Sequence, residues 1–292
     1  MKHEISYGKE QITLYRTYAR PLDGVTPVPE SPFRGRSNLV FGADVDVEVL
    51  DDNFLPSYTE GDNTNVVATD SMKNFVLEKG LAFDGATLES FLWFVGRELL
   101  REYAQMGHLR LRARELAFEP LTDVLLAARH DDRGFAELEL DRSRVLDHRG
   151  GRTDLQLIKT TGSSFTRFVR DQHTTLPEVV DRPLFVWLDV FWRYADPMDA
   201  VGGDAGRYVA SEQVRDVCAA VFDELNSKSI QQLVWVMGHR VLERFPRLDE
   251  VSFVAQNRLW DTFFQRSDDP KVRAATDPRP GNGRITLALR RG

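Results

Sequence analysis

The sequence of 292 residues contains a single cysteine, Cys218, and no long uninterrupted run of apolar residues. One cysteine excludes disulfides within the chain and any site built from several thiolates, and Cys218 itself lies in an apolar pattern typical of a helix core. No segment approaches the roughly 18 apolar residues of a membrane-spanning helix, and the N-terminus has no apolar signal segment. Acidic residues outnumber basic ones by 45 to 38, a net charge of -7 that argues against nucleic acid or an anionic membrane as a partner. These absences predict a cytoplasmic protein.

The common motifs for metals and cofactors are missing as well. The six histidines show none of the spacings of a zinc site, and no group of cysteines accompanies them. The glycine patterns that bind dinucleotides or nucleoside triphosphates are missing, as is the Gly-x-Ser-x-Gly elbow of serine hydrolases. The sequence therefore predicts neither a metal nor an organic cofactor.

The chain does contain amphipathic segments in a repeated order. Apolar residues alternate in the expected strands and recur at helical spacing in the expected helices. A first set of two strands, two helices and two strands is expected over 7–18, 45–49, a segment starting near Asn65, 88–103, 109–118 and 135–145. A second set in the same order is expected over 155–160, 184–194, 214–225, 230–241, 251–254 and 285–289.

This duplicated ββααββ order predicts an α+β protein with two domains, 1–150 and 151–292. Each would be an antiparallel sheet with helices on one face. The other face and the edges of such a sheet are left open, which is usually resolved by closure or by assembly of several copies. We therefore expect a homo-oligomer.

The first of three polar clusters that could bind a ligand lies at residues 68–74. Thr69 or Asp70 could simply cap the helix that follows, because their side-chain oxygens accept from the free N–H groups of a first helical turn. The same helix start could instead hold an anion. The local sequence leaves both interpretations open.

The other two clusters contain aromatic, guanidinium and amide groups. Phe165 could be a core residue and Arg182 a partner in a surface ion pair. Alternatively, the aromatic ring could stack on a planar ligand while the guanidinium donates to an anionic heterocycle. The third cluster, Ser229-Ile230-Gln231 with Gln256-Asn257-Arg258 further along, offers amides that could contact the edge of such a ring.

Several short motifs follow one another along the chain and together form a recognisable set. They are Tyr7-Gly8-Lys9, Gly61-Asp62-Asn63-Thr64, Ala68-Thr69-Asp70-Ser71-Met72-Lys73-Asn74, Phe165-x-x-Phe168-x-Arg170-Asp171 with Thr174-Thr175-Leu176, Asp181-Arg182, Ser229-Ile230-Gln231 and Gln256-Asn257. This set resembles the motifs of the urate oxidase (uricase) family in its bacterial form, in the correct order from about residue 7 to residue 290. The resemblance implies the tunnelling fold, in which two ββααββ domains per chain close into a barrel between two chains and two barrels stack into a homotetramer. It also implies oxidation of urate by O₂ and water to 5-hydroxyisourate and H₂O₂, a step of purine degradation, without metal or organic cofactor.

The resemblance further implies roles for residues that bind the substrate at an interface between chains. Phe165 would stack on the purine ring, Arg182 and Gln231 would grip its edge, and Ile230 would line the pocket. From the partner chain, Thr69 and Asp70 would contact the opposite edge of the ring.

The same resemblance implies a proton-transfer dyad of Lys9 and Thr69, with Asn257 holding O₂ or water above the ring. A lysine acts as a base near neutral pH only when burial or a neighbouring charge disfavours its protonated form, so Lys9 is expected to be buried at the interface. Many uricases have a histidine one or two residues after the asparagine, whereas this chain has Arg258 and Leu259. Arg258 cannot serve as a neutral base, because its guanidinium stays protonated, but it could orient a water or support an anionic state.

Two alternatives follow from these features. The tunnelling fold also occurs in pterin-processing enzymes, but their sites resemble clusters of histidine or cysteine that this chain lacks. A catalytically impaired urate-binding protein would keep Phe165, Arg182 and Gln231. It would have no reason to keep Lys9 and Thr69, both of which are present.

Overall fold

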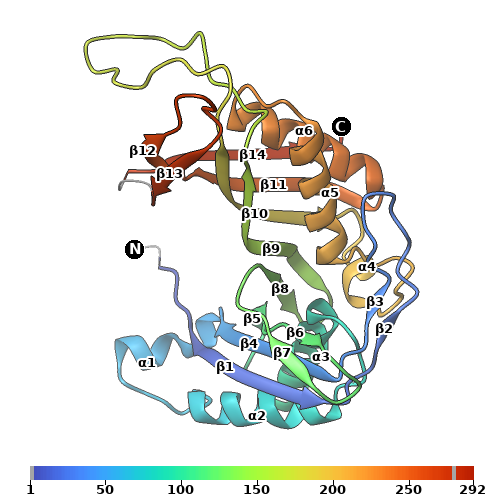
Figure 1. Ribbon diagram of the computed structural model, residues 1–292. Helices are drawn as coiled ribbons and strands as arrows, with labels where there is room; N and C mark the ends of the chain where they lie inside the picture. Colours follow the sequence, from blue (N-terminus) through green and yellow to red (C-terminus); the bar gives the residue numbers. More distant parts are fainter. Residues whose placement is uncertain (1–2, 278–280) are drawn as a thin grey trace. The chain divides into compact units, whose positions relative to one another are not determined.

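The computed structural model describes residues 3–277 and 281–292 and divides the chain into two compact units (Figure 1). Unit 1 comprises the residues up to Pro27, Phe33–Gly151 and Arg193–Ala210. Unit 2 comprises Val28–Pro32, Arg152–Trp192 and the residues from Ser211 onward. The short stretch 277–281, expected to be irregular because of its two prolines, falls largely on residues 278–280, which lie outside the described part.

Unit 1 is an antiparallel sheet with helices packed on one face. Its strands follow the order β1 (Tyr7–Thr17), β4 (Val40–Val49), β5 (His108–Glu115) and β8 (Arg133–Asp141), and its long helices are α2 (Thr69–Ala82) and α3 (Leu88–Glu102). The shorter elements are β2 (Leu22–Asp23), β3 (Gly35–Arg36), η1 (Asp52–Phe54), α1 (Leu55–Thr59), β6 (Phe118–Pro120), β7 (Leu126–Ala128) and α4 (Met198–Val201). Helix α2 packs against β1, and α3 packs against β5 and β8.

Unit 2 has the same plan. Its strands follow the order β9 (Val145–Lys159), which begins in unit 1, β10 (Leu184–Tyr194), β11 (Leu248–Asn257) and β14 (Gly283–Arg290). Helices α5 (Ser211–Glu224) and α6 (Ile230–Arg244) pack on each other, and α6 covers β11 and β14 (Figure 1). A separate hairpin of β12 (Asp261–Gln265) and β13 (Arg273–Thr276) follows β11. The α+β class and the repeated ββααββ order are therefore confirmed.

One expected boundary between strands is wrong. The alternating segment 135–145 is not a single strand: β8 ends at Asp141 and β9 already begins at Val145, ten residues before the expected start. The reason is a tight turn, in which the Asp141 carboxylate accepts hydrogen bonds from the backbone N–H groups of Ser143 (2.7 Å) and Arg144 (2.8 Å). An aspartate that bonds to the backbone two or three residues ahead is a typical turn former.

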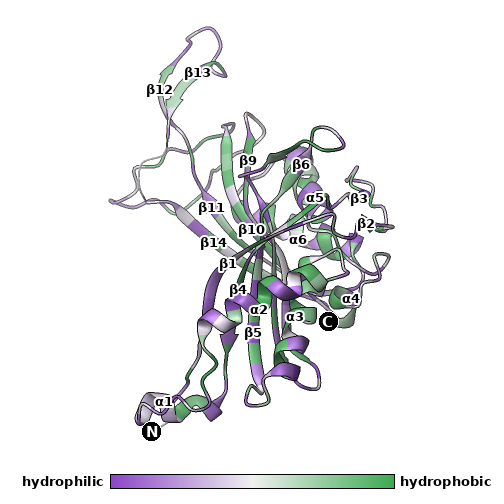
Figure 2. Cartoon of the chain, turned by 90° about the horizontal axis from the view of Figure 1, so that it is seen from below, coloured by the Kyte–Doolittle hydropathy of each residue, from purple (hydrophilic) through white to green (hydrophobic). Residues whose placement is uncertain are grey.

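The core of each unit lies between the helices and the facing side of the sheet. A Cβ at Gly96 of α3 would touch Leu111 and Leu140, and a Cβ at Gly238 of α6 would touch Phe253 and Leu289, so these strand residues point toward the helices. The buried side chains alternate along the strands with half-buried ones, and bands of hydrophobic and hydrophilic residues follow one another along the elements in Figure 2. The helix-core position expected for Cys218 is confirmed, since its side chain is fully buried on α5.

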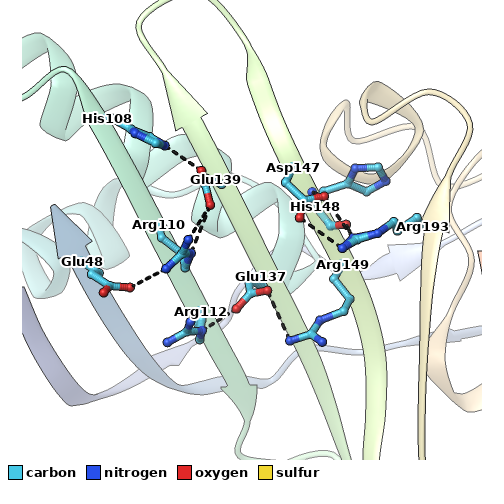
Figure 3. Close-up of polar contacts among 10 residues, drawn as sticks. All are labelled: Glu48, His108, Arg110, Arg112, Glu137, Glu139, Asp147, His148, Arg149 and Arg193. Atoms are coloured by element: carbon cyan, nitrogen blue, oxygen red, sulfur yellow. Dashed lines mark hydrogen bonds and ion pairs between the residues drawn. The ribbon is translucent and has the colours of Figure 1, made fainter. Parts of the chain in front are cut away.

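The other face of the unit 1 sheet carries a row of ion pairs (Figure 3). Arg110 lies between Glu48 (3.2 Å) and Glu139 (2.8 Å), and His108 contacts the second oxygen of Glu139 at 2.8 Å. Further along the same face, Glu137 bridges Arg112 and Arg149. The half-buried charges therefore neutralise one another across neighbouring strands, and we call this set the ion-pair ladder.

Candidate active site

Lys9 is held in place by an unusually close approach of two strands in unit 1. It is half-buried and stands opposite Val47 of β4, immediately before a bulge in β1. A Cβ atom at the preceding Gly8 would lie 1.8 Å from the carbonyl oxygen of Val47, so only glycine fits there. In the bulge, Gln11 adopts a φ of 56° and donates its backbone N–H to the Asp46 carboxylate at 2.8 Å. The position of Lys9 is thus fixed by backbone geometry.

Tyr7 connects this strand to the start of α2. Its hydroxyl oxygen accepts the backbone N–H of Val67 at 3.2 Å, and its ring packs edge-on against Phe54 with the centroids 4.9 Å apart. Burial raises the pKa of the Tyr7 hydroxyl above its ordinary value, which keeps it in the neutral form. Since Val67 precedes Thr69 by two residues, Tyr7 ties the segment carrying Thr69 and Asp70 to the strand carrying Lys9.

Thr69 and Asp70 form the first turn of α2, and neither of them caps the helix. The N-cap is Ala68, which has no capping side chain, so the expectation of a Thr69 or Asp70 cap is wrong. The reason is that the helix starts one residue earlier than a cap at Thr69 requires, with the carbonyl of Ala68 accepting the N–H of Met72 at 3.2 Å. The first turn therefore has no side-chain acceptor at its N-cap, and such a turn favours a negatively charged partner.

Asp70 is exposed and engaged by cations. Its carboxylate accepts from Lys73 Nζ at 2.7 Å and from Asn74 Nδ2 at 3.2 Å. The hydrogen bond and charge of Lys73 hold the pKa of Asp70 below its ordinary value, and the charge of Lys9 adds to the effect. Asp70 is thus an ionised carboxylate within the electrostatic reach of Lys9.

In unit 2, Asp181 organises the loop before β10. It accepts from Thr161 Oγ1 and from the backbone N–H of Gly162, both at 2.7 Å, and these hydrogen bonds hold its pKa below the ordinary value. The next residue, Arg182, donates its backbone N–H to Ser163 at 2.9 Å. The carboxylate is therefore used by the loop and not by the neighbouring guanidinium.

Arg182 and Phe165 form an aromatic and cationic pair. The backbone of Phe165 exchanges two hydrogen bonds with Val179, and its half-buried ring stacks on Phe168 with centroids 4.8 Å apart and planes 15° apart. The Arg182 guanidinium carbon lies 5.5 Å from the centre of the Phe165 ring. Phe165 and Phe168 are thus half-buried and not core residues, and Arg182 faces an aromatic ring where a surface ion pair was the alternative.

The guanidinium of Arg182 is only partly satisfied. Its Nε is buried and has no hydrogen-bond partner among residues 3–277 and 281–292. Burial lowers the pKa of Arg182 below its ordinary value, but an arginine stays charged at neutral pH. A buried donor without a partner is costly, and an anionic ligand with an acceptor at this position would satisfy it.

Ile230 and Gln231 begin α6 next to the same loop. Ser229 caps the helix by accepting the N–H of Gln232 at 3.1 Å, and Ile230 is buried while Gln231 is exposed. Just before the helix, the carbonyl of Ser227 accepts the N–H of Ser164 at 2.9 Å. The start of α6 and the loop carrying Phe165 are therefore joined backbone to backbone.

Asn257 ends β11, opposite Gly283 of β14. Its Oδ1 is buried and, within the described part of the chain, accepts no hydrogen bond. The next residue, Arg258, donates its N–H to the carbonyl of Phe185 at 3.0 Å. Phe185 lies three positions after Arg182 in the sequence. Asn257 thus lies at the end of the sheet where β10 begins.

The structure gathers the predicted residues into two groups. Lys9, Thr69 and Asp70 lie together in unit 1, and Phe165, Arg182, Ile230, Gln231 and Asn257 lie at one end of unit 2. The contributions of Tyr7 and Asp181 were missed by sequence reasoning, although both belong to the motifs Tyr7-Gly8-Lys9 and Asp181-Arg182. No group of three or more His, Cys, Asp or Glu that could hold a metal ion occurs in the described residues. Over the same residues, no helix has the length and apolar character needed to cross a membrane.

An aromatic face, a half-buried guanidinium and amides at helix and strand ends define a class of protein that binds a planar anionic ring. Comparisons with known proteins give the family. The family model described as Uricase matches residues 148–284. A uricase of Haloferax volcanii is 49% identical over 272 residues, covering 88% of each chain. Among solved structures, a uricase from Bacillus fastidious has a TM-score of 0.96 at 39% identity, covering 99% of this chain and 94% of that one.

A urate oxidase from Bacillus sp. TB-90 is similar to the same degree, with a TM-score of 0.95 at 38% identity over 98% of this chain and all of the other. The chain therefore belongs to the uricase family. The family resemblance carried by the short motifs is confirmed, and the likeness extends over nearly the whole chain.

Proposed function

We propose that this chain is a urate oxidase that converts urate, O₂ and water into 5-hydroxyisourate and H₂O₂. The observation that carries the proposal is the Arg182 guanidinium beside the Phe165 ring, in a chain of the uricase family. The buried Nε of Arg182 has no partner among the described residues. Urate is a planar anionic heterocycle, which matches this pair of groups. A urate-binding protein without turnover does not fit the relatives, whose names are those of uricases and urate oxidases.

Unit 2 supplies the groups that bind the ring. Phe165 stacks on the purine, and Arg182 donates to one edge of the anion together with the exposed amide of Gln231. Ile230 gives an apolar wall, and Asn257 holds O₂ or water above the ring. Arg182 Nε and Asn257 Oδ1 support these roles, because each is a buried polar atom without a partner in the described part of the chain, and a ligand would satisfy it.

Unit 1 supplies the groups that move protons. Lys9 and Thr69 form the dyad that removes and relays protons, so that the electron-rich urate dianion can pass an electron to O₂. Asp70 and Thr69 contact the edge of the ring opposite to Arg182. The anion-favouring start of α2 supports this placement.

The two groups of residues belong to one site when two chains assemble. We place Lys9, Thr69 and Asp70 of one chain against the ring-binding residues of a second chain, in a homotetramer of two stacked barrels. Strand β1 ends the strand order of unit 1 and β14 ends that of unit 2, and such edges are commonly paired by assembly. The division into tunnelling-fold domains 1–150 and 151–292 is part of the same proposal, and the cytoplasmic location stays a prediction.

The proposal is tested by mixing purified protein, treated with a metal chelator, with urate. The ultraviolet band of urate, the O₂ concentration and the peroxide concentration are followed together. We expect urate loss, O₂ consumption and peroxide formation in a ratio of one to one to one. Binding of urate without its consumption across a pH series would contradict the proposal.

A further inference from the structure

The end of β11 carries a stacked arrangement that the proposed reaction does not use. The Arg258 guanidinium carbon lies 3.6 Å from the centre of the Trp187 indole, which is the distance of direct stacking. Arg258 also donates through Nε (3.1 Å) and Nη2 (2.8 Å) to Oε1 of Gln256. One face of the guanidinium and two of its donors are therefore committed within unit 2.

Arg258 has no carboxylate partner in the part of the chain that the structure describes. Its contacts there are the neutral amide of Gln256, the indole of Trp187 and the carbonyl of Phe185. The half-buried guanidinium is therefore held by stacking and by neutral acceptors, for which its planar fork is suited. This argues against Arg258 as a substitute for the histidine expected after the asparagine.

The stacked arrangement lies on the side of the sheet away from the helices. Trp187 alternates along β10 with the buried Val186 and Leu188, so its indole faces away from the core between sheet and helices. Along β11, Phe253 and Ala255 are buried, and Asn257 continues their side of the strand while Gln256 lies on the opposite side. Arg258 and Asn257 are thus neighbours in sequence whose side chains serve opposite faces.

Aromatic rings extend the stack past the end of the strand. Phe185 packs edge-on against Trp187 at 6.4 Å and against Trp260 at 6.1 Å. Together with the hydrogen bond from Arg258 N–H to the Phe185 carbonyl, these rings hold residues 256–260 on both sides of Asn257. Immobilising the backbone on both sides of a residue limits the orientations of its side chain.

We propose that Arg258, clamped between Trp187 and Gln256, is a positioning residue that orients the Asn257 side chain. The inference rests on the proposed function, in which Asn257 holds O₂ or water above the ring. Arg258 acts from the opposite face through the shared backbone, and it touches neither substrate nor O₂. Its stacking keeps the buried Oδ1 of Asn257 directed at the reacting molecule.

Three variants separate stacking from charge. Arg258→Lys keeps the positive charge but loses the planar fork, Trp187→Leu removes the aromatic face, and Trp187→Phe restores an aromatic face. We expect Arg258→Lys and Trp187→Leu to lower kcat about tenfold, with KM for urate within about twofold and an unchanged shape of the kcat against pH profile. Trp187→Phe should recover most of kcat. Ser252→Ala, on the same face of β11 but outside the stack, is the matched control and should behave like the parent protein.

Several outcomes would overturn the inference. Full activity of Arg258→Lys would show that the planar guanidinium is not needed, and a shifted pH profile in that variant would show that the side chain acts in catalysis. An unchanged kcat in Trp187→Leu would show that the stack is irrelevant. If the parent protein itself fails to oxidise urate, the proposed function fails instead. A crystal structure of Trp187→Leu then decides the inference without activity: altered or multiple Asn257 side-chain orientations support it, and the single parental orientation contradicts it.

Discussion

The two units repeat one order of elements but differ in chemistry. Unit 1 presents Lys9, Thr69 and Asp70 and covers the open face of its sheet with the ion-pair ladder (Figure 3). Unit 2 presents aromatic, guanidinium and amide groups, and β10 carries Phe185 and Trp187 on its open face. In the proposed function, the same backbone plan serves proton transfer in one unit and binding of a planar ring in the other, because the side chains at the element ends are free to differ.

Carboxyl groups on the two open faces show the same contrast. Burial opposes ionisation of Glu139, but the hydrogen bonds from Arg110 and His108 outweigh it and hold its pKa below the ordinary value. In unit 2, burial raises the pKa of Asp189, whose carboxylate accepts a hydrogen bond from the backbone N–H of Asp154 at 2.9 Å. The Glu139 carboxyl of unit 1 is thus paired with cations, whereas the Asp189 carboxyl of unit 2 accepts from a backbone donor.

The largest effect is expected from Lys9→Met, which removes the proposed base of unit 1. Because a positioned general base contributes about 10²- to 10⁴-fold, kcat should fall by that factor while urate binding and assembly are kept. Steady-state kinetics and equilibrium binding of urate without O₂ measure the two quantities. A kcat within tenfold of the parent value would refute the dyad.

Arg182→Ala tests the ring-binding role of unit 2. The loss of a two-pronged, charge-assisted contact should raise KM for urate about 100-fold, with a smaller change in kcat. Arg167→Ala, which changes an exposed arginine of the same loop, serves as the control. If KM stays unchanged in Arg182→Ala, the guanidinium does not bind the substrate.

Glu89→Gln tests a buried carboxyl in the core of unit 1. Glu89 is 4% exposed and accepts from Tyr208 Oη at 3.2 Å, and burial raises its pKa from 4.5 to about 7. A carboxyl whose folded pKa is raised stabilises the protein fully below its unfolded pKa and loses that contribution as the pH rises through the folded value. Relative to Glu89→Gln, the parent should therefore lose roughly 3 kcal/mol of unfolding free energy between about pH 4.5 and about pH 8.

Denaturant unfolding of both proteins across this pH range measures the difference. Parallel curves for parent and variant would mean that Glu89 is not held in its neutral form. Phe222→Leu, a buried change in unit 2 with no ionisable group, should shift stability equally at every pH.

The smallest effects are expected from Glu139→Gln and Asp189→Asn, which compare the two open faces directly. Glu139→Gln should lower stability by less than about 1 kcal/mol near neutral pH, because its partners are partly exposed. This loss should shrink as the pH falls from the ordinary pKa of 4.5 through the lowered folded pKa, because the stabilisation is fully present only above the unfolded value. For Asp189→Asn, the unfolding free energy relative to the parent protein should rise as the pH increases, whereas for Glu139→Gln it should fall. If the relative unfolding free energies of both variants changed with pH in the same direction, the contrast between the two open faces would be wrong.

Periodic features of the fold could be predicted from the sequence, and those that depend on neighbouring strands could not. The helix expected over 88–103 is α3, because its apolar residues recur at helical spacing and Thr87 and Ser90 form a capping box. The start of β9 was missed because Gly150, Gly151 and the charged residues around them hide the alternation of a strand that is buried unevenly.

The same limit applies to the candidate site. The short motifs identified Lys9, Phe165 and Arg182. The cap expected at Thr69 or Asp70 was wrong because the N-cap is Ala68, a difference of one residue in the helix start that the sequence does not reveal. The partner of Arg258 could not be predicted, because Trp187 is 71 positions away and meets it only across β10 and β11.

The central claim is that the proton-transfer group of unit 1 and the ring-binding group of unit 2 act in one site formed by two chains. Lys9→Met and Arg182→Ala chains, separately tagged and co-expressed, test it in assemblies purified through both tags. For random two-fold pairing, one of the two sites in each mixed pair regains both native groups, which gives about a quarter of parental activity in the unselected mixture. Tetramers purified through both tags lack the pure assemblies of either variant and should therefore recover slightly more, about 30%. Recovery at this level is the predicted result. Doubly tagged assemblies with no more activity than either variant alone would contradict the account.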